Sequence, residues 1–191
     1  MKARILSELL AGLLIMSLVQ SRADGQTKPK QASRAELAPG QLLDFYRRAC
    51  PLGGCPSYRV AVDDKGAVAY DGRWQVLTIG KASATLTADA LADLKNVLTR
   101  VDAVRGVLAR ECTDGHTDDF KFVISFRLSQ AVRTLHDYQG CTHVKGGDAD
   151  LIELRRLEGR IEAILQVEKW IGTEKERRTR MREAQRKGVP W

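Results

Sequence analysis

The segment Cys50–Tyr58, with the sequence Cys-Pro-Leu-Gly-Gly-Cys-Pro-Ser-Tyr, constrains the fold more than any other part of this chain. Its two cysteines flank a glycine pair, and the chain then enters a stretch in which apolar and polar residues alternate. A link between these cysteines would fix a turn at the entrance to a β-strand. Two further cysteines, Cys112 and Cys141, lie downstream, and four cysteines allow three pairings.

Residues 1–23 have the three parts of a secretory signal. Lys2 and Arg4 precede an apolar stretch, and small residues near Ala23 suit cleavage by a signal peptidase. We therefore expect cleavage after Ala23, an exported product that is periplasmic or secreted, and no transmembrane segment after cleavage. A retained leader that anchors the chain is the alternative.

The formal net charge of +7 is distributed unevenly along the 191 residues. Residues 38–172 have a net charge of zero, whereas the residues from Thr173 onward carry seven basic and three acidic side chains. A nucleic-acid-binding domain would carry its basic stripe on the folded body, so the sequence argues against a specific nucleic-acid partner. We instead expect the basic tail to be a solvated helix or disordered, or to contact an anionic surface.

The composition divides the chain into four parts. A signal peptide at 1–23 is followed by a flexible linker at 24–40, which contains few bulky apolar residues. Residues 41–172 form one domain of ordinary size, and residues 173–191 form the basic tail, which is disordered or helical.

Alternation with a period of two predicts several strands in the first half of the domain. Residues 58–62 alternate, and residues 68–70 resume the pattern after a turn. Residues 71–72 have the composition of a second turn, and residues 74–79 and 82–86 are expected to continue the sheet.

The second half contains the clearest strand, residues 120–128, in which large apolar side chains occupy every other position. A turn at 129–130 leads to a partner strand at 132–138, whereas residues 105–119 are expected to be irregular. The stretch 42–48 fits either a short strand or a helical turn.

Two helices complete the pattern. Thr87 is expected to cap the first helix, whose apolar stripe includes Leu94 and Leu98. Asp148 is expected to cap the second helix, with a stripe that runs from Leu151 to Leu165. The order β-meander, helix, hairpin, helix predicts an α+β fold: an antiparallel sheet with two helices packed on one face.

The segment 50–72 resembles the opening of a bacterial family called domain of unknown function 6438. The shared pattern is a cysteine, a short glycine-containing loop, Cys-Pro-x-Tyr and a hairpin that leads to Tyr-x-Gly. The later half fits as well, through Cys112-Thr113-Asp114-Gly115, the Tyr138-x-Gly140-Cys141 element and a final helix that ends at Trp170.

The likeness covers residues 42–172 and implies this fold in an exported bacterial domain. It implies no mechanism, because the family name assigns no activity. Two features depart from the family pattern: the loop 51–54 is one residue longer, and Asp137 separates His136 from Tyr138.

The cysteines have a structural interpretation and a chemical one. A disulfide between Cys50 and Cys55 would close the glycine turn, and one between Cys112 and Cys141 would join the loops at one end of the hairpin. Alternatively, Cys112, His116, Cys141 and His143 could supply the two sulfurs and two nitrogens that zinc accepts. A redox role is disfavoured because four residues separate Cys50 from Cys55 and a strand follows them.

Acid–base chemistry is a further alternative. The loop 112–119 contains Asp114, His116, Asp118 and Asp119, and a histidine beside a carboxylate can act in proton transfer. His136, on a strand, is expected to be a packed or exposed side chain.

We therefore expect an exported, disulfide-stabilised bacterial domain that acts as a non-catalytic binding or interaction module, with no cofactor and no assigned catalytic residue. The alternative is an enzyme or a metal-binding protein that uses the 112–119 loop with Cys141 and His143. The sequence identifies neither ligand nor partner.

Overall fold

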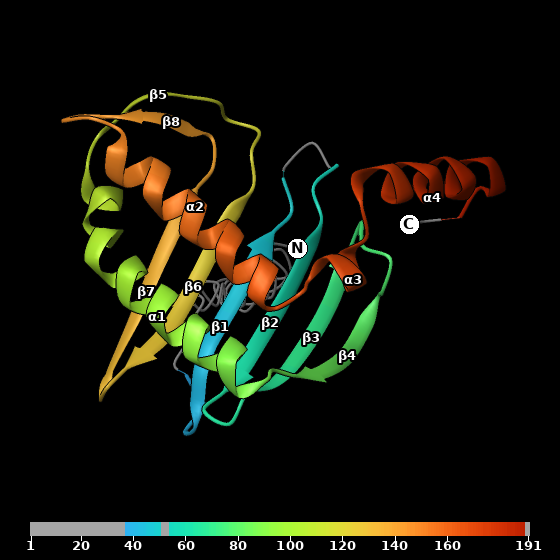
Figure 1. Ribbon diagram of the computed structural model, residues 1–191. Helices are drawn as coiled ribbons and strands as arrows, with labels where there is room; N and C mark the ends of the chain where they lie inside the picture. The colour runs from blue at the N-terminus through green and yellow to red at the C-terminus, as the bar shows by residue number, and fades with distance from the viewer. Residues whose placement is uncertain (1–36, 51–53, 190–191) are drawn as a thin grey trace, which may run out of the picture. The chain divides into compact units, whose positions relative to one another are not determined.

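A six-stranded antiparallel sheet in the order β4-β3-β2-β1-β6-β7 forms the centre of the fold (Figure 1). The computed structural model describes residues 37–50 and 54–189, so the predicted leader at 1–23 and residues 24–36 of the predicted linker lie outside the described residues. The strands of this sheet are β1 (Gln41–Arg48), β2 (Ser57–Asp63), β3 (Ala67–Trp74), β4 (Gly80–Thr85), β6 (Lys121–Leu128) and β7 (Ala131–Tyr138).

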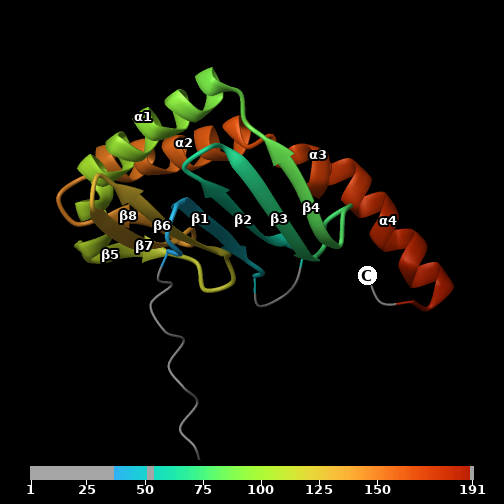
Figure 2. The same cartoon turned by 90° about the horizontal axis from the view of Figure 1, so that it is seen from below.

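A smaller sheet pairs β5 (Cys112–Gly115) with β8 (Cys141–Val144). The helices are α1 (Ala88–Val104), the 3-10 helix η1 (Arg105–Ala109), α2 (Ala149–Ile164), α3 (Glu168–Ile171) and α4 (Glu174–Lys187). Helices α1 and α2 lie side by side on one face of the large sheet (Figures 1 and 2). The predicted α+β fold, with two helices on one face of an antiparallel sheet, is confirmed.

The stretch 42–48, which fits a strand or a helical turn by sequence, forms the central strand β1. Its side chains Leu43 and Phe45 are fully buried. They lie opposite Phe126 and Ile124 of β6 in the strand register. Residues two apart on a strand share a face, so Leu43 and Phe45 both enter the core that also contains residues of α1 and α2, and tertiary packing selects the strand.

Helices α1 and α2 begin where the sequence predicted, but their cap residues make different hydrogen bonds. Thr87 caps α1, because its Oγ1 accepts a hydrogen bond from the amide of Ala90 at 3.2 Å. Asp148 occupies the cap position of α2, but its side chain makes no capping bond. Its Oδ1 instead accepts the amide of Val144 at 2.9 Å, which ties the loop before α2 to the helix start.

The β3–β4 hairpin differs from the prediction. Strand β3 continues through residues 71–72 to Trp74, and residues 75–79 form the loop. A side chain at Gly72 would collide with the carbonyl oxygen of Thr78, because the loop folds back over the strand at that point. The prediction of a turn at 71–72 and a strand at 74–79 was therefore wrong.

The segment 105–119 is more regular than predicted. It contains η1 and then β5, which pairs with β8 although the two strands are separated by the whole β6–β7 hairpin. A four-residue strand without apolar alternation leaves no periodic signal, so only the long-range pairing identifies it.

Candidate interaction surface

Both disulfides join cysteines that the sequence had paired. The Cα atoms are 5.5 Å apart in Cys50–Cys55 and 5.9 Å apart in Cys112–Cys141. The second disulfide links β5 to β8 at the end of the β6–β7 hairpin. Both cysteine pairs are thus committed to cross-links, and neither offers a thiolate to a metal or a substrate in this form.

Asp114 of β5 and His143 of β8, two of the candidate site residues, lie opposite each other in the β5–β8 register. His143 Nδ1 lies 2.6 Å from a carboxylate oxygen of Asp148. This contact raises the pKa of His143, which lies in the solvent with 58% of its side chain exposed. The arrangement is a hydrogen-bonded histidine–carboxylate pair at the end of the small sheet.

The other two histidines lie elsewhere. His116 is exposed just after β5, and its amide donates to the carbonyl of Gly140 at 2.7 Å. His136 is exposed on β7, opposite Val123 of β6. Among the described residues, no three His, Cys, Asp or Glu side chains are grouped closely enough to hold a metal ion.

A buried carboxyl pair was missed by the sequence analysis. Asp137 of β7 and Glu158 of α2 are each 1% exposed. Gln139 donates to both carboxyl groups, and Arg155 lies 3.5 Å from Asp137. Burial first, and then the neighbouring Asp137, raises the pKa of Glu158 to about 9. Glu158 therefore keeps its proton at neutral pH.

This pair left a signal in the sequence. Asp137 follows the buried Leu135 at the period of a strand, and Glu158 stands between Leu154 and Ile161 at helical spacing. Each carboxyl group thus occupies a core-facing position of its element, and a buried carboxyl group requires a partner. Arg155 connects the pair to the second disulfide, because it donates to the carbonyl of Cys141.

The C-terminal helices are attached to the β3–β4 loop by main-chain bonds. The amides of Leu77 and Thr78 donate to the carbonyls of Ile171 and Trp170 at 3.3 and 2.9 Å. Gly172 follows with a φ of +74°, and a side chain there would collide with Leu77. The chain therefore turns sharply between α3 and α4 because residue 172 has no side chain.

Helix α4 has a well-formed start. Thr173 and Glu176 make a reciprocal capping box, in which each side chain bonds the main-chain amide of the other residue. Arg177 donates to the carbonyl of Gly172 at 2.5 Å, and Arg180 donates to that of Leu77 at 2.6 Å. The Arg180 bond attaches α4 to the hairpin loop, whereas the capping box and the Arg177 bond fix the turn from which α4 starts.

Arg177 also faces a polar group at the end of the large sheet. There, the hydroxyl of Tyr58 donates to Glu162 of α2, and Arg47 Nη1 lies 3.5 Å from the same carboxylate. Burial, and then repulsion by Arg47, lowers the pKa of Arg177. Tyr58, the tyrosine of the Cys-Pro-x-Tyr element, thus belongs to the polar group that Arg177 of α4 faces.

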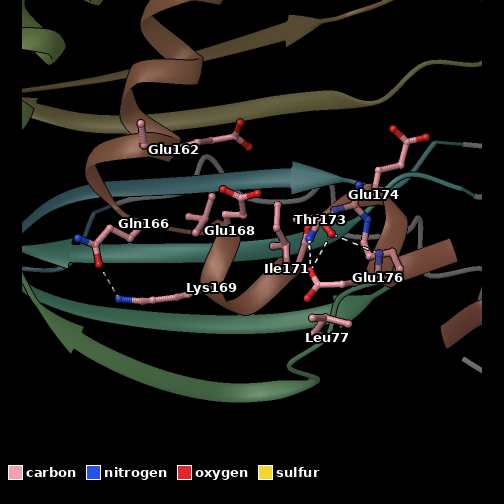
Figure 3. A pocket seen from close by; sticks show the side chains of 13 residues that line it. Leu77, Glu162, Gln166, Glu168, Lys169, Ile171, Thr173, Glu174 and Glu176 are labelled. Atoms are coloured by element: carbon pink, nitrogen blue, oxygen red, sulfur yellow. Dashed lines mark hydrogen bonds between the residues drawn. The ribbon is translucent and has the colours of Figure 1, made fainter. Parts of the chain in front are cut away.

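A groove of about 830 Å³ lies between the end of α2, α3 and the start of α4. Figure 3 shows the side chains that line it. Its apolar side chains include Leu77, Val167 and Ile171, and its charged side chains include Glu162, Glu168 and Arg177. Several of the charged groups already serve other contacts: Glu162 accepts from Tyr58, and Arg177 binds Gly172. None of the three histidines lines this groove.

The two sides of α4 differ in character. The inner side carries Arg177 and Met181, which are half-buried, and Ala184, which is buried. The outer side, which we call the basic face, consists of the exposed side chains Lys175, Arg178, Arg182 and Arg186. At 3.6 residues per turn these four positions fall within about 80° of one another, and the centre of this arc lies about 130° around the helix from the centre of the inner side.

One ion pair moderates the charge of the basic face, because Arg178 contacts Glu174 one turn earlier. Both side chains are about two-thirds exposed, so the pair is solvated and contributes little binding energy of its own. The basic face thus presents four cations to the solvent, with the carboxylates of Glu174 and the exposed Glu183 beside them.

No helix in the described part of the chain is long and apolar enough to cross a membrane. Among curated proteins, none matches this chain. The family model described as Domain of unknown function (DUF6438) matches residues 41–165, from β1 to the first residue after α2. Helices α3 and α4 lie beyond this match. The match covers more than half of the chain, and the protein belongs to the DUF6438 family.

Proposed function

We propose that this protein is exported to an oxidising compartment and acts there as a non-catalytic binding module, which engages an anionic partner through the basic face of α4. The main support for this proposal is that the two sides of α4 differ in character. The inner side is used to hold the helix on the domain, and four exposed basic side chains are left on the outer side.

Export is supported by the leader-like sequence of residues 1–23 and by the two disulfides. Disulfides persist in secreted and periplasmic proteins and are rare where thiols are kept reduced. Fractionation of a bacterial host that expresses the full chain tests this step. Recovery of the protein only in the cytoplasm, with four thiols that titrate after denaturation without reductant, would contradict export.

The anionic partner is supported by where the charge lies. Residues 38–172 are neutral overall, whereas α4 alone carries a net charge of +4. Salt at physiological strength limits the reach of exposed charges to about 8 Å. An anionic partner is therefore attracted to α4 and not to the molecule as a whole.

Binding to immobilised dextran sulfate, measured at 50 and 500 mM salt, tests this function. The test variant replaces the basic face by glutamine: K175Q, R178Q, R182Q and R186Q. A matched control removes four exposed lysines of the domain: K65Q, K81Q, K95Q and K145Q. We expect the unchanged protein and the control to bind at low salt and the test variant to lose binding. Equal loss in both variants would mean that net charge alone drives the binding.

The alternative function, an enzyme or metal protein that uses the 112–119 loop with Cys141 and His143, makes a different prediction. It requires stoichiometric metal or a measurable activity that depends on His143. Metal analysis of protein purified without a histidine tag, before and after reduction of the disulfides, distinguishes the two functions.

A further inference from the structure

The geometry of α4 points to a specific partner: we propose that the basic face lies flat on an anionic phospholipid bilayer. This inference rests on the proposed function and names the class of its partner. It concerns a peripheral contact, since no described helix could span the membrane.

The basic face is linear. Its residues lie at positions 175, 178, 182 and 186 of one uninterrupted helix. At a rise of 1.5 Å per residue they span about 16 Å along the helix axis. A straight row of cations on a convex surface can contact a planar array of phosphates with all its members at once. It cannot enclose a compact ligand.

The helix is already folded and attached before it meets a surface. The capping box and the bonds from Arg177 and Arg180 hold it in place. Many membrane-surface helices pay the entropy of folding when they bind. Because α4 is ordered in advance, this cost is small, and a short row of four cations can suffice.

One feature of α4 favours lipid headgroups over single-stranded nucleic acid, and a second provides a place for a headgroup phosphate. The outer side of α4 carries no aromatic side chain on which bases could stack, although stacking is common in sites for single strands. It does have an open depression, which is lined by Glu174, Lys175, Arg178, Thr179 and Arg182. Basic residues and a hydroxyl around an open depression fit the phosphate of a headgroup.

Three of the five large apolar side chains that are exposed in the described part of the chain lie at the same end of the molecule, whereas Val132 lies on β7 and Ile152 on α2. The β3–β4 hairpin end adjoins α4 in both views of the fold (Figures 1 and 2). On it, Trp74 is 42% and Ile79 is 54% exposed, and Val189, just beyond α4, is 53% exposed. Tryptophan favours the headgroup region, and apolar contact adds to electrostatic attraction at an interface.

The neutral domain makes the contact directional. An anionic membrane attracts α4, while residues 38–172 contribute no net charge. The molecule would therefore bind with its α4 end toward the bilayer. In this orientation α1 and α2, which form the helical layer of the domain, do not need to touch the lipid.

Vesicle co-sedimentation tests this inference with the protein isolated from the periplasm of a host that expresses the full chain. The probes are vesicles of phosphatidylcholine alone and vesicles with about one-third phosphatidylglycerol, at 50 and 500 mM salt. Each basic residue near an anionic surface contributes on the order of fivefold in partitioning. We therefore expect binding to the anionic vesicles only, reduced at least tenfold by the K175Q, R178Q, R182Q and R186Q variant and by high salt. The four-lysine control should bind almost as the unchanged protein does.

The outcomes separate the two proposals. Binding to dextran sulfate without binding to anionic vesicles would overturn the bilayer inference and leave the proposed function standing. Absence of binding to both would overturn both. Equal binding to neutral and anionic vesicles would show that the basic face does not provide the attraction, and would also overturn the inference. Circular dichroism of each variant establishes that α4 and the domain are still folded.

Discussion

The guanidinium of Arg180 donates to the carbonyl oxygen of Leu77 at 2.6 Å, across 103 positions of the sequence. Arg180 lies on α4, beyond the part of the chain that matches the family, and Leu77 lies in the β3–β4 loop inside it. The same loop donates two amides to α3. The β3–β4 loop therefore provides the hydrogen bonds that attach α3 and α4 to the domain.

Replacing Arg180 by alanine should loosen α4 without unfolding the domain. A hydrogen bond from a charged group to a carbonyl contributes about 1.5–3 kcal/mol when buried and less when solvated, as this one is. We expect faster hydrogen exchange at the amides of α4 and unchanged exchange in β6 and β7. The control R182A, on the outer side, should leave α4 exchange as it is. Unchanged exchange in R180A would show that the capping box alone holds the helix.

The alanine variants of two glycines should differ in stability. Gly172 and Gly188 both have positive φ values, +74° and +63°, so alanine is strained at either position. Only at Gly172 would the new side chain also collide with a neighbour, Leu77. We expect G188A to lower the free energy of unfolding by about 1 kcal/mol and G172A by clearly more. Urea denaturation measures both, and equal losses would contradict the close approach of Leu77.

The two disulfides should contribute unequally. In the chain-entropy model the Cys112–Cys141 link, with a sequence separation of 29, stabilises the fold by about 3.5 kcal/mol. The Cys50–Cys55 link, with a separation of 5, contributes about 2 kcal/mol. Thermal denaturation of the C112S/C141S and C50S/C55S double variants should show the larger loss for the first. The reverse order would mean that the reduced chain already restrains the β5–β8 loops.

The buried Glu158 should make stability depend on pH. Its folded pKa of about 9 lies above the ordinary value of 4.5, so between these values the folded protein keeps a proton that the unfolded chain releases. The free energy of unfolding therefore falls as pH rises through this window. Glutamine stays neutral and can replace the protonated acid, so E158Q should gain stability relative to the unchanged protein at pH 8, and less at pH 5.

The matched control for this prediction is E153Q, which replaces a half-buried carboxylate of the same helix that pairs with Arg100 and Arg156. Hydrogen bonding from Arg156 lowers the pKa of Glu153, so its replacement should slightly reduce stability at neutral pH. Chemical denaturation between pH 5 and 8 follows both variants. A pH dependence in E158Q as steep as in the unchanged protein would assign the effect to Asp137 or to another group.

Much of the central fold follows from local patterns in the sequence. The alternation around Phe122 and Ile124 predicted β6, and Thr87 marked the start of α1, because strand period and helix capping depend on neighbours in the chain. The cysteine spacing likewise suggested the two pairings that the structure contains. The strand and helix signals are local, and the Cys112–Cys141 pairing follows from the β6–β7 hairpin, whose two strands are neighbours in the sequence.

The tertiary structure decided the features that depend on contacts between residues far apart in the sequence. The loop 75–79 is not a strand because its amides bond to α3, almost 100 residues away. Asp137 of β7 and Glu158 of α2 share a site in the core, where Gln139 bonds both carboxyl groups, and neither residue signals the other in the sequence. The net charge of the tail was visible in the sequence, but its sorting into an inner and an outer side of α4 was not. That sorting required the hairpin loop and Arg180 to fix which side of the helix faces the domain.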